Sequence, residues 1–451
     1  MAAPVLLVNA NRIRPPIAPI AIDYLGTALE DAGFAVRVLD LAWSRDVEGD
    51  VARALAERPL LVGLTFRNLD DSSAASRRSF VAEHREVVRL IKSHTDAPVV
   101  VGGSGLSIAP GAALRALGAH AAVRGEGEGA IVALALGRPG GGPPIDLSAV
   151  AAPRRSFVDN ARYLREGAQV GFETSRGCDG RCAYCADTLS KGCRVRARSP
   201  QSVAAELESL AAKGVDVFHT CDSEFNADPG HARAVCRAIA GRGLGGRIRW
   251  YAYCRPDRFG VELAEAMRAA GCAGVNFGAD HVDAAMLARL GRAHRAANIE
   301  SARFACRRAG MAVMLDMLFG APGETRKTIE GAVESLRVLD PEAAGIALGL
   351  RLYRGTPLGD ELAPPGAPPR PGVTGAADDL LEPAFFVEPG LGEDIGAHLA
   401  SLVGKDRRFF YLGPAAGGEI ASYNYNENDP LDRAIAAGAR GAYWDILRSM
   451  R

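Results

Sequence analysis

The sequence has no apolar run that approaches the roughly 20 residues a membrane-spanning helix requires. It also has no excess charge of either sign, because 53 Lys and Arg residues balance 53 Asp and Glu residues. A neutral chain does not predict a broad surface for nucleic acid or anionic lipid. The first residues, Met-Ala-Ala-Pro-Val-Leu-Leu-Val, lack the basic stretch of a secretory signal peptide. We therefore expect a cytoplasmic protein with neither a membrane nor a nucleic-acid partner.

Cysteine is scarce, with nine residues in a chain of 451. Five are scattered through strand-like and helix-like segments, where cysteine behaves as a small buried apolar residue; these are Cys221, Cys236, Cys254, Cys272 and Cys306. Three others form a C-x3-C-x2-C run, called the cysteine motif below: Cys178, Cys182 and Cys185. In a reducing compartment these thiols stay free of disulfides. The local concentration of thiols makes the motif the first candidate site.

The spacing of the cysteine motif suits an iron–sulfur cluster. Three thiolates on one short loop can hold three irons of a [4Fe-4S] cluster, which leaves the fourth iron open to a small molecule. Gly177 and Gly180 allow the loop to fold tightly, and Tyr184 is placed to cover the cluster from water. The alternative is a structural zinc site with Cys193 as a fourth ligand, although zinc sites usually combine separated pairs of cysteines.

The first part of the chain alternates between strand and helix patterns. Strands are predicted over 5–9, 35–40, 60–66, 98–102 and 120–124, with helices over 22–32, 51–57, 81–94 and 110–117. This alternation predicts a doubly wound, Rossmann-like parallel sheet over residues 1–136. Ligands of such sheets bind at the carboxyl ends of the strands, which here carry polar or glycine-rich segments at 9–11, 67–71 and 102–105.

A Gly- and Pro-rich stretch at 137–144 begins a predicted linker that runs to residue 165. A second alternating series follows, with strands at 170–174, 215–221, 248–253, 273–278, 311–318 and 345–351 and helices at 200–213, 231–241, 261–270, 283–290, 299–309 and 325–339. Six such units predict a partial (β/α)6 TIM barrel over 166–358. The fold class is therefore α/β. Residues 359–451 are predicted to form a small α-rich capping region.

The cysteine motif and this layout resemble the radical S-adenosylmethionine (SAM) superfamily, in its branch with an N-terminal cobalamin-binding-type domain. The resemblance covers roughly residues 4–358, with family-like segments at 15–26, 102–103 and 124–128. It implies a [4Fe-4S] cluster that cleaves SAM reductively. It also implies an electron donor such as flavodoxin or ferredoxin. Tyr184 matches the aromatic residue that the family carries before its third cysteine.

One departure from this resemblance leaves cobalamin binding open. Domains of this type that ligate cobalt from below use D-x-H-x-x-G after the first strand, whereas this chain has Asn-Ala-Asn-Arg-Ile-Arg over 9–14. Arg67, Asp70 and Asp71 also stand where the loop would meet the corrin ring. The two alternatives are a cobalamin site without that histidine and a vestigial sheet that only supports the barrel.

The resemblance also places the SAM contacts. The stretch Asp222-Ser223-Glu224, after the second barrel strand, matches the segment that holds the ammonium of SAM; the alternative is a helix N-cap, for which Asp228 competes. Arg351, at the end of the sixth strand, is a further cofactor-binding candidate.

Gly320 and Gly323 match the segment that passes the adenine of SAM, because glycine permits close backbone approach. Glycine-rich strand exits are common, and Thr325 is equally a candidate N-cap of the next helix.

Acidic and aromatic residues near the predicted strand ends indicate the substrate. Together with Asp222 and Glu224, Asp280 and Asp316 predict an acidic pocket for a cationic, polyhydroxylated small molecule. The alternative for Asp316 is an internal ion pair with Arg351.

The main functional hypothesis is a lyase: radical dehydration of an amino-sugar diol in antibiotic biosynthesis, with Glu224, Tyr253 or Asp280 assisting loss of water. It resembles in layout the radical dehydratases that act on the amino sugar paromamine. The alternative is a cobalamin-dependent methyltransferase acting on an unactivated carbon. A third class is a non-catalytic iron–sulfur or zinc protein. A further cysteine cluster, typical of peptide-maturing members, is missing from the sequence.

Overall fold

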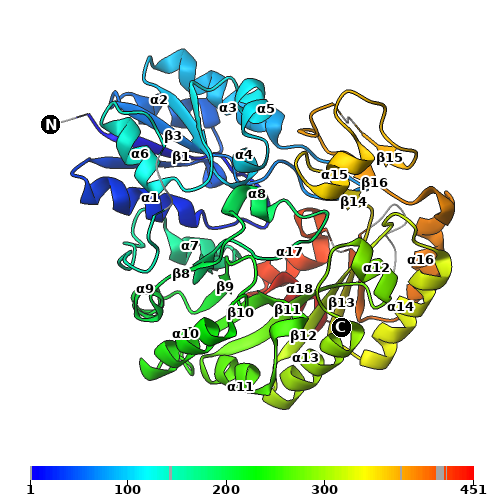
Figure 1. Ribbon diagram of the computed structural model, residues 1–451. Helices are drawn as coiled ribbons and strands as arrows, with labels where there is room; N and C mark the ends of the chain where they lie inside the picture. Colours follow the sequence, from blue (N-terminus) through cyan, green and yellow to red (C-terminus); the bar gives the residue numbers. More distant parts are fainter. Residues whose placement is uncertain (1–2, 142–144, 376–377, 413–420, 423, 451) are drawn as a thin grey trace.

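The computed structural model describes residues 3–141, 145–375, 378–412, 421–422 and 424–450, and residues 142–144 of the predicted linker lie outside this part. Two α/β units stack on each other, the N-terminal one in blue and cyan and the larger one in green and yellow, with short helix α8 (Asp187–Lys191) between them (Figure 1). No helix in the described residues combines the length and apolarity needed to cross a bilayer.

The N-terminal unit is a five-stranded parallel sheet in the order β2-β1-β3-β4-β5. Its strands are β1 (Val5–Asn9), β2 (Val36–Asp40), β3 (Leu61–Thr65), β4 (Val99–Gly102) and β5 (Ala121–Val123), and its helices are α1 (Ile20–Asp31), α2 (Val47–Leu55), α3 (Val81–His94), α4 (Ser104–Ile108), α5 (Pro110–Leu117) and α6 (Glu128–Ala135). The central strand β1 is buried throughout, as expected when helices cover both faces. The doubly wound prediction is confirmed, with two further helices, α4 and α6, in segments without a clear helical period.

The second unit is a parallel sheet that begins with the six predicted strands. They are β6 (Val170–Phe172), β9 (Val217–Thr220), β10 (Arg249–Cys254), β11 (Cys272–Asp280), β12 (Ala312–Phe319) and β13 (Ala343–Leu348). The helices between and around them are α7 (Asn160–Arg165), α9 (Pro200–Ala212), α10 (Pro229–Gly241), α11 (Val261–Ala269), α12 (Ala284–Arg289), α13 (Ala296–Ala309) and α14 (Arg326–Leu339). A two-stranded ribbon of β7 (Ser175–Arg176) and β8 (Arg196–Ala197) flanks the cysteine motif.

The strand predicted at 345–351 is divided in the structure. Gly349 has φ +100°, a conformation that favours glycine, and it ends the barrel strand β13. The next two residues form β14 (Leu350–Arg351), which belongs to a separate three-stranded sheet with β16 (Phe385–Phe386) and β15 (Val373–Thr374). Arg351 therefore does not lie at the end of a barrel strand.

The C-terminal residues contribute strands as well as helices. Strands β17 (Phe409–Leu412) and β18 (Ala421–Ser422) extend the barrel sheet beyond β13 to eight strands, in addition to helices α15 (Pro357–Leu362), α16 (Ile395–Val403), α17 (Asp429–Ala436) and α18 (Tyr443–Ser449). Parallel pairing with β13 links this region to the barrel core. The tail is therefore an integral part of the barrel.

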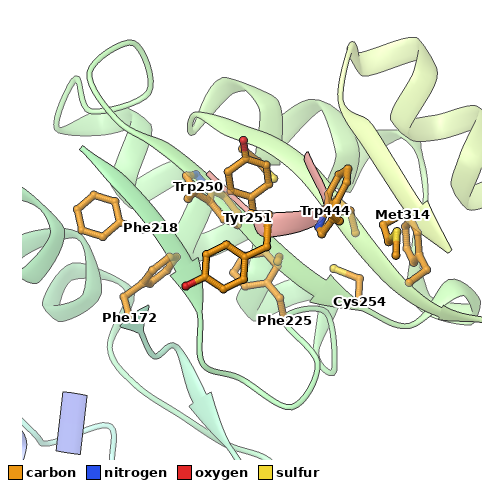
Figure 2. Packing of buried hydrophobic residues seen from close by; sticks show 14 of the residues in the cluster. Phe172, Phe218, Phe225, Trp250, Tyr251, Cys254, Met314 and Trp444 are labelled. Atoms are coloured by element: carbon orange, nitrogen blue, oxygen red, sulfur yellow. The ribbon is translucent and has the colours of Figure 1, made fainter. Parts of the chain in front are cut away.

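Alternation along the barrel strands divides aromatic residues between two faces. Trp250 packs edge-on against Phe172, with ring centroids 5.8 Å apart, on the helix-covered face (Figure 2). On the inner face, Tyr251 meets Trp444 of α18 at 6.0 Å (Figure 2). The Tyr251 hydroxyl donates to Asp445 at 2.7 Å. The C-terminal helix therefore packs against the inner face of the sheet.

A buried ionic network joins the two units. The guanidinium of Arg155 donates to Asp23 of α1 at 2.8 Å and to Glu206 of α9, and all three side chains are fully buried. Glu206 also accepts from Arg198 at 2.7 Å. Because these residues come from the N-terminal unit, the linker and the barrel, the network fixes the orientation of one unit on the other.

Candidate functional site

A cleft of about 600 Å³ lies between the carboxyl ends of the N-terminal strands and the barrel mouth. Asn9, Thr65 and Gly102 line it from the N-terminal unit, and Thr220 and Tyr253 line it from the barrel. This is the place at which doubly wound sheets bind their ligands, and the predicted polar ends of strands meet here.

The inner end of the cleft is a narrow apolar slot over the sheet. Leu7, Gly63 and Val100 are register partners across β1, β3 and β4, and Ile131 of α6 lines the same cleft. A Cβ atom added at Gly63 would lie 3.1 Å from Leu7 Cδ2 and 3.3 Å from Ile131 Cδ1, which is tighter than ordinary contact. The missing side chain therefore keeps open a slot that suits a flat apolar ring, such as the base at the end of a cobalamin tail.

In the D-x-H-x-x-G pattern the histidine position falls on Asn11, whose Oδ1 accepts from Ile13 N at 2.9 Å, and the Asp position falls on Asn9. Asn9 donates to Asp40 at 2.8 Å and to Tyr163 at 3.0 Å. Arg67 is one of the basic residues that line the cleft, and burial lowers its pKa against the opposing influence of Cys221 and the nearby tyrosines. The residues present fit a corrinoid that is not ligated by a protein imidazole from this loop.

The cysteine motif forms a tight loop between β7 and α8. A Cβ atom at Gly180 would lie 3.2 Å from Cys178 Sγ and 3.7 Å from Cys182 Sγ, so the loop curls closely around its glycine. Burial raises the pKa of all three thiols, in Cys185 to about 12. Neutral thiols need a metal to displace their protons, which fits iron ligands.

The zinc alternative gains no support from the described residues. Cys193 is exposed and lies after α8 rather than within the loop. In the described part of the chain, no three His, Cys, Asp or Glu side chains are arranged for a single metal ion. A four-iron cluster needs a wider arrangement of thiols than one ion does.

Arg292 is a site residue that sequence reasoning missed. Its Nη1 donates to Cys182 Sγ at 3.0 Å, and its Nε lies 3.2 Å from Asp280 Oδ2. The Tyr184 hydroxyl donates to the same carboxylate oxygen at 2.6 Å. Asp280 has φ +58°, an unusual backbone conformation for a non-glycine residue, and these partners hold it in place. Arg292 and Cys182 are 110 residues apart, so no spacing rule connects them.

The three residues of the Asp222-Ser223-Glu224 segment have different contacts and therefore different roles. The Asp222 carboxylate accepts from Thr174 N at 2.7 Å and Ser175 N at 2.8 Å, which orders the chain leading into the cysteine motif. Ser223 faces the cleft, 3.4 Å from Lys191 Nζ. Glu224 lies beside Cys178 and Cys182 in a small pocket.

The electrostatics of Glu224 favour a cationic partner. Burial raises its pKa to about 7, while Arg292 and Arg255 act in the opposite direction. The charged form is therefore stabilised by an added cation such as the ammonium of SAM. The competing N-cap role belongs to Asp228, whose side chain caps α10.

The glycine-rich segment after β12 is shaped by backbone conformations that favour glycine. Gly320 and Gly323 have φ +95° and +83°. Glu324 is 3% exposed; it accepts from the Gly320 and Ala321 amides and lies 3.0 Å from His281 Nε2. Thr325 is the N-cap of α14, as its alternative role predicted.

Arg351, predicted as a cofactor contact, does not line the cleft and instead makes buried contacts that stabilise the fold. Its guanidinium lies 2.8 Å from Asp70 and donates to Leu380 O and Leu381 O at 3.0 and 3.2 Å. The alternative in which Asp316 pairs with Arg351 is wrong, because Arg351 pairs with Asp70 of the N-terminal unit. The break at Gly349 explains the difference.

Tyr253 and Asp316 meet at the barrel interior. Tyr253 is 41% exposed and packs at 5.1 Å against the ring of His219. Burial raises its pKa, and the Asp316 carboxylate raises it further. The structure therefore places these two predicted residues near each other on the inner face of the barrel.

Comparison with known proteins agrees with this architecture. The Radical SAM superfamily matches residues 172–336 and the B12 binding domain matches residues 6–135. The tryptophan 2-C-methyltransferase of Streptomyces laurentii is 36% identical over 444 residues, covering 80% of this chain and 74% of that protein.

Solved structures show the same relation. The methyltransferase TsrM from Kitasatospora setae, with tryptophan and a SAM analogue bound, is similar with a TM-score of 0.92 and 34% identity, covering 99% of this chain and 98% of that one. The cobalamin-dependent enzyme OxsB shares the fold alone, with a TM-score of 0.69 and 15% identity over 86% of this chain and 64% of its own.

These similarities overturn one hypothesis and confirm others. The dehydratase assignment, with its lyase class and amino-sugar substrate, is wrong, because the proteins that are more than 30% identical over most of this chain are methyltransferases. The expected fold class and the cofactor set of [4Fe-4S] cluster, SAM and cobalamin agree with the matched domains.

Proposed function

Because the chain belongs to the radical SAM superfamily, in its branch with an N-terminal B12-binding domain, we propose that it is a cobalamin-dependent methyltransferase that acts on a ring carbon of tryptophan or a closely related indole. The observation that carries this proposal is similarity over essentially the whole chain to a methyltransferase that binds tryptophan. It includes the C-terminal helices that pack against the inner face of the barrel.

The residues present would hold each cofactor at a defined place. The slot at Gly63 and the Gly102 edge would take the corrinoid, and the cysteine motif would take the cluster. Ser223 and Glu224 would hold the ammonium of SAM. When bound, cobalamin supplies a methyl carrier and the cluster an open iron for SAM, while the protein provides orientation and exclusion of water.

The barrel mouth suits a flat aromatic substrate. His219 and Tyr253 form one pair of rings, and Tyr425 and Tyr443 form another with centroids 5.4 Å apart. Arg67 lies near both Tyr253 and Tyr443 and lowers the pKa of each hydroxyl, against the larger effect of burial. Aromatic side chains favour stacked or edge-on contact with an indole ring.

A labelling experiment tests the proposal. The anaerobically reconstituted protein is incubated with cobalamin, L-tryptophan and SAM carrying a trideuterated methyl group, with dithionite or a flavodoxin system as the electron donor we expect. Mass spectrometry should detect a trideuteromethyl group on the ring, and NMR its position. The matched control omits only cobalamin and should give no product. Methyl transfer that continues without cobalamin, or labelled SAM consumed with no labelled tryptophan or indole product, would overturn the proposal.

A further inference from the structure

An ionic cluster ties the N-terminal unit to the cysteine motif. Arg176 stands two residues before Cys178, and its Nη2 lies 2.6 Å from Glu128 Oε1. Its Nη1 lies 3.5 Å from Glu126, and its Nε donates to Glu173, just after β6, at 2.9 Å. Carboxylates of both units therefore hold the residue from which the motif starts.

The same segment of the N-terminal unit contacts both strands of the ribbon beside the motif. Arg176 ends β7, and its register partner on β8 is Arg196. Arg196 Nη2 lies 2.5 Å from Glu126, which also accepts from Ile145 N at 2.8 Å. Glu126 and Glu128 thus fix the ribbon against the N-terminal unit.

The ribbon in turn sets the path of the cysteine motif. Gly177 has φ +92°, and a Cβ atom there would overlap the carbonyl oxygen of Arg194. Cys178 N donates to Gly192 O at 3.1 Å. Because this corner is closely packed, the position of Arg176 and that of the first thiol are linked.

The other end of this ion pair belongs to the helix that lines the slot. Glu128 is the first residue of α6, and Ile131, three residues later, lies on the same face and narrows the slot at Gly63. Glu128, Ile131 and Arg176 all line the cleft. The side chains of Arg176 and Glu128 are still 13% and 16% exposed, so a corrinoid in the cleft would remove water from around them. An ion pair strengthens as water is excluded.

We propose that the Arg176–Glu128 pair couples corrinoid binding to the [4Fe-4S] site, so that occupation of either site strengthens the other. Contact of a corrinoid with α6 fixes Glu128 and thereby Arg176, which orders the cysteine motif. By linkage, an occupied cluster site raises the affinity for the corrinoid by the same factor. Arg176 and Glu128 are positioning residues in this scheme. The inference concerns the two cofactor sites and goes beyond the proposed reaction, because it is independent of the substrate.

Cobalamin affinity with and without the cluster measures this coupling. Equilibrium dialysis under anaerobic conditions titrates the full chain with hydroxocobalamin, once after iron–sulfur reconstitution and once in the cluster-free form. Coupling between two sites typically changes affinity about 5- to 150-fold, so we expect the cluster-loaded protein to bind cobalamin at least about 5-fold more tightly. Equal affinity in the two forms would overturn the inference.

The variant Glu128→Gln tests whether the ion pair carries the coupling, because it keeps the size of the side chain and removes its charge. In this variant the ratio of the two affinities should fall toward one. Glu83→Gln is the matched control and should keep the ratio of the unmodified protein. Glu83 is likewise an acidic residue in the first turn of a helix, α3, and it pairs with Arg78 at 3.0 Å, but its side chain is 49% exposed and lies away from the cleft.

The ratio separates coupling from a merely structural role. Direct contact of Glu128 with the corrinoid, or a general loss of stability, would lower both affinities alike; an unchanged ratio in Glu128→Gln would therefore overturn the inference. If Glu128→Gln takes up no cluster, Glu128→Asp serves instead, because it keeps the charge and withdraws it from Arg176 by one methylene. It should lower the ratio in the same direction, and an unchanged ratio there overturns the inference equally. Neither result bears on the proposed methyl acceptor, which the labelling experiment tests separately.

Discussion

The ionic network between the two units predicts a large effect from a single change, Arg155→Met. The Arg155 guanidinium donates to Asp23 at 2.8 Å, to Asn160 at 3.1 Å and to Gly171 O at 3.0 Å, as well as to Glu206. After replacement, Glu206 keeps its pair with Arg198. Asp23 keeps only neutral donors and becomes a buried anion without a counter-charge.

The expected cost follows from that uncompensated charge. Removing one partner of a buried pair typically lowers the free energy of unfolding by about 3–5 kcal/mol. Arg154→Met, one residue away, is the matched control: Arg154 pairs with Asp31 on the surface, with side chains 48% and 57% exposed. Exposed pairs of this kind contribute about 0–1 kcal/mol.

Urea unfolding of the apoprotein, followed by tryptophan fluorescence, measures both variants. Trp43 reports on the N-terminal unit and Trp250 and Trp444 on the barrel, so single-tryptophan versions show whether the units separate before they unfold. Corrinoid binding should weaken as well, because α1 lines the cleft.

A second replacement tests the cause. Asp23→Asn in the Arg155→Met background removes the stranded charge and should recover part of the lost stability. The reasoning is refuted if Arg155→Met costs no more than Arg154→Met, or if Asp23→Asn destabilises the double variant further.

Three further changes concern the cysteine motif, the cobalamin slot and a buried histidine of α3. Cys182→Ala should abolish the iron–sulfur absorbance and 5′-deoxyadenosine formation from SAM, whereas Cys193→Ser should keep both. Loss of bound metal in Cys193→Ser would instead show that Cys193 is a fourth ligand, as the zinc alternative requires. Gly63→Ala should weaken cobalamin binding by roughly 5- to 100-fold through overpacking, as measured by gel filtration and absorbance. Gly129→Ala on α6 is the control and should leave binding unchanged, because a Cβ there meets nothing within 4 Å. Equal binding by the two variants would contradict the slot assignment. Burial lowers the pKa of His84. Below about pH 6.5 the unfolded chain therefore takes up a proton that the folded chain does not, and the free energy of unfolding falls as pH falls. His84→Leu should make this dependence shallower between pH 5 and 7 in urea titrations, and an unchanged slope would show that His84 does not cause it.

Much of the fold could be predicted from local patterns. The helix at 81–94 and the helix at 110–117 have the predicted bounds, because an apolar period or a proline start is contained within the segment itself. The division at Gly349 could not be predicted, since a continuous apolar run does not reveal where the chain leaves one sheet for another. The strands β17 and β18 were missed because their pairing with β13 is a long-range contact.

The sequence by itself determined the cysteine motif and its chemistry, since three thiols within one short loop must lie close together in any fold. Only the tertiary structure decided the partners of the charged side chains. Arg292 meets Cys182 across 110 residues and Arg351 meets Asp70 across 281. The charge of a side chain is fixed by its type, but its energy depends on distance and burial, and these are set only when the sheets and helices pack.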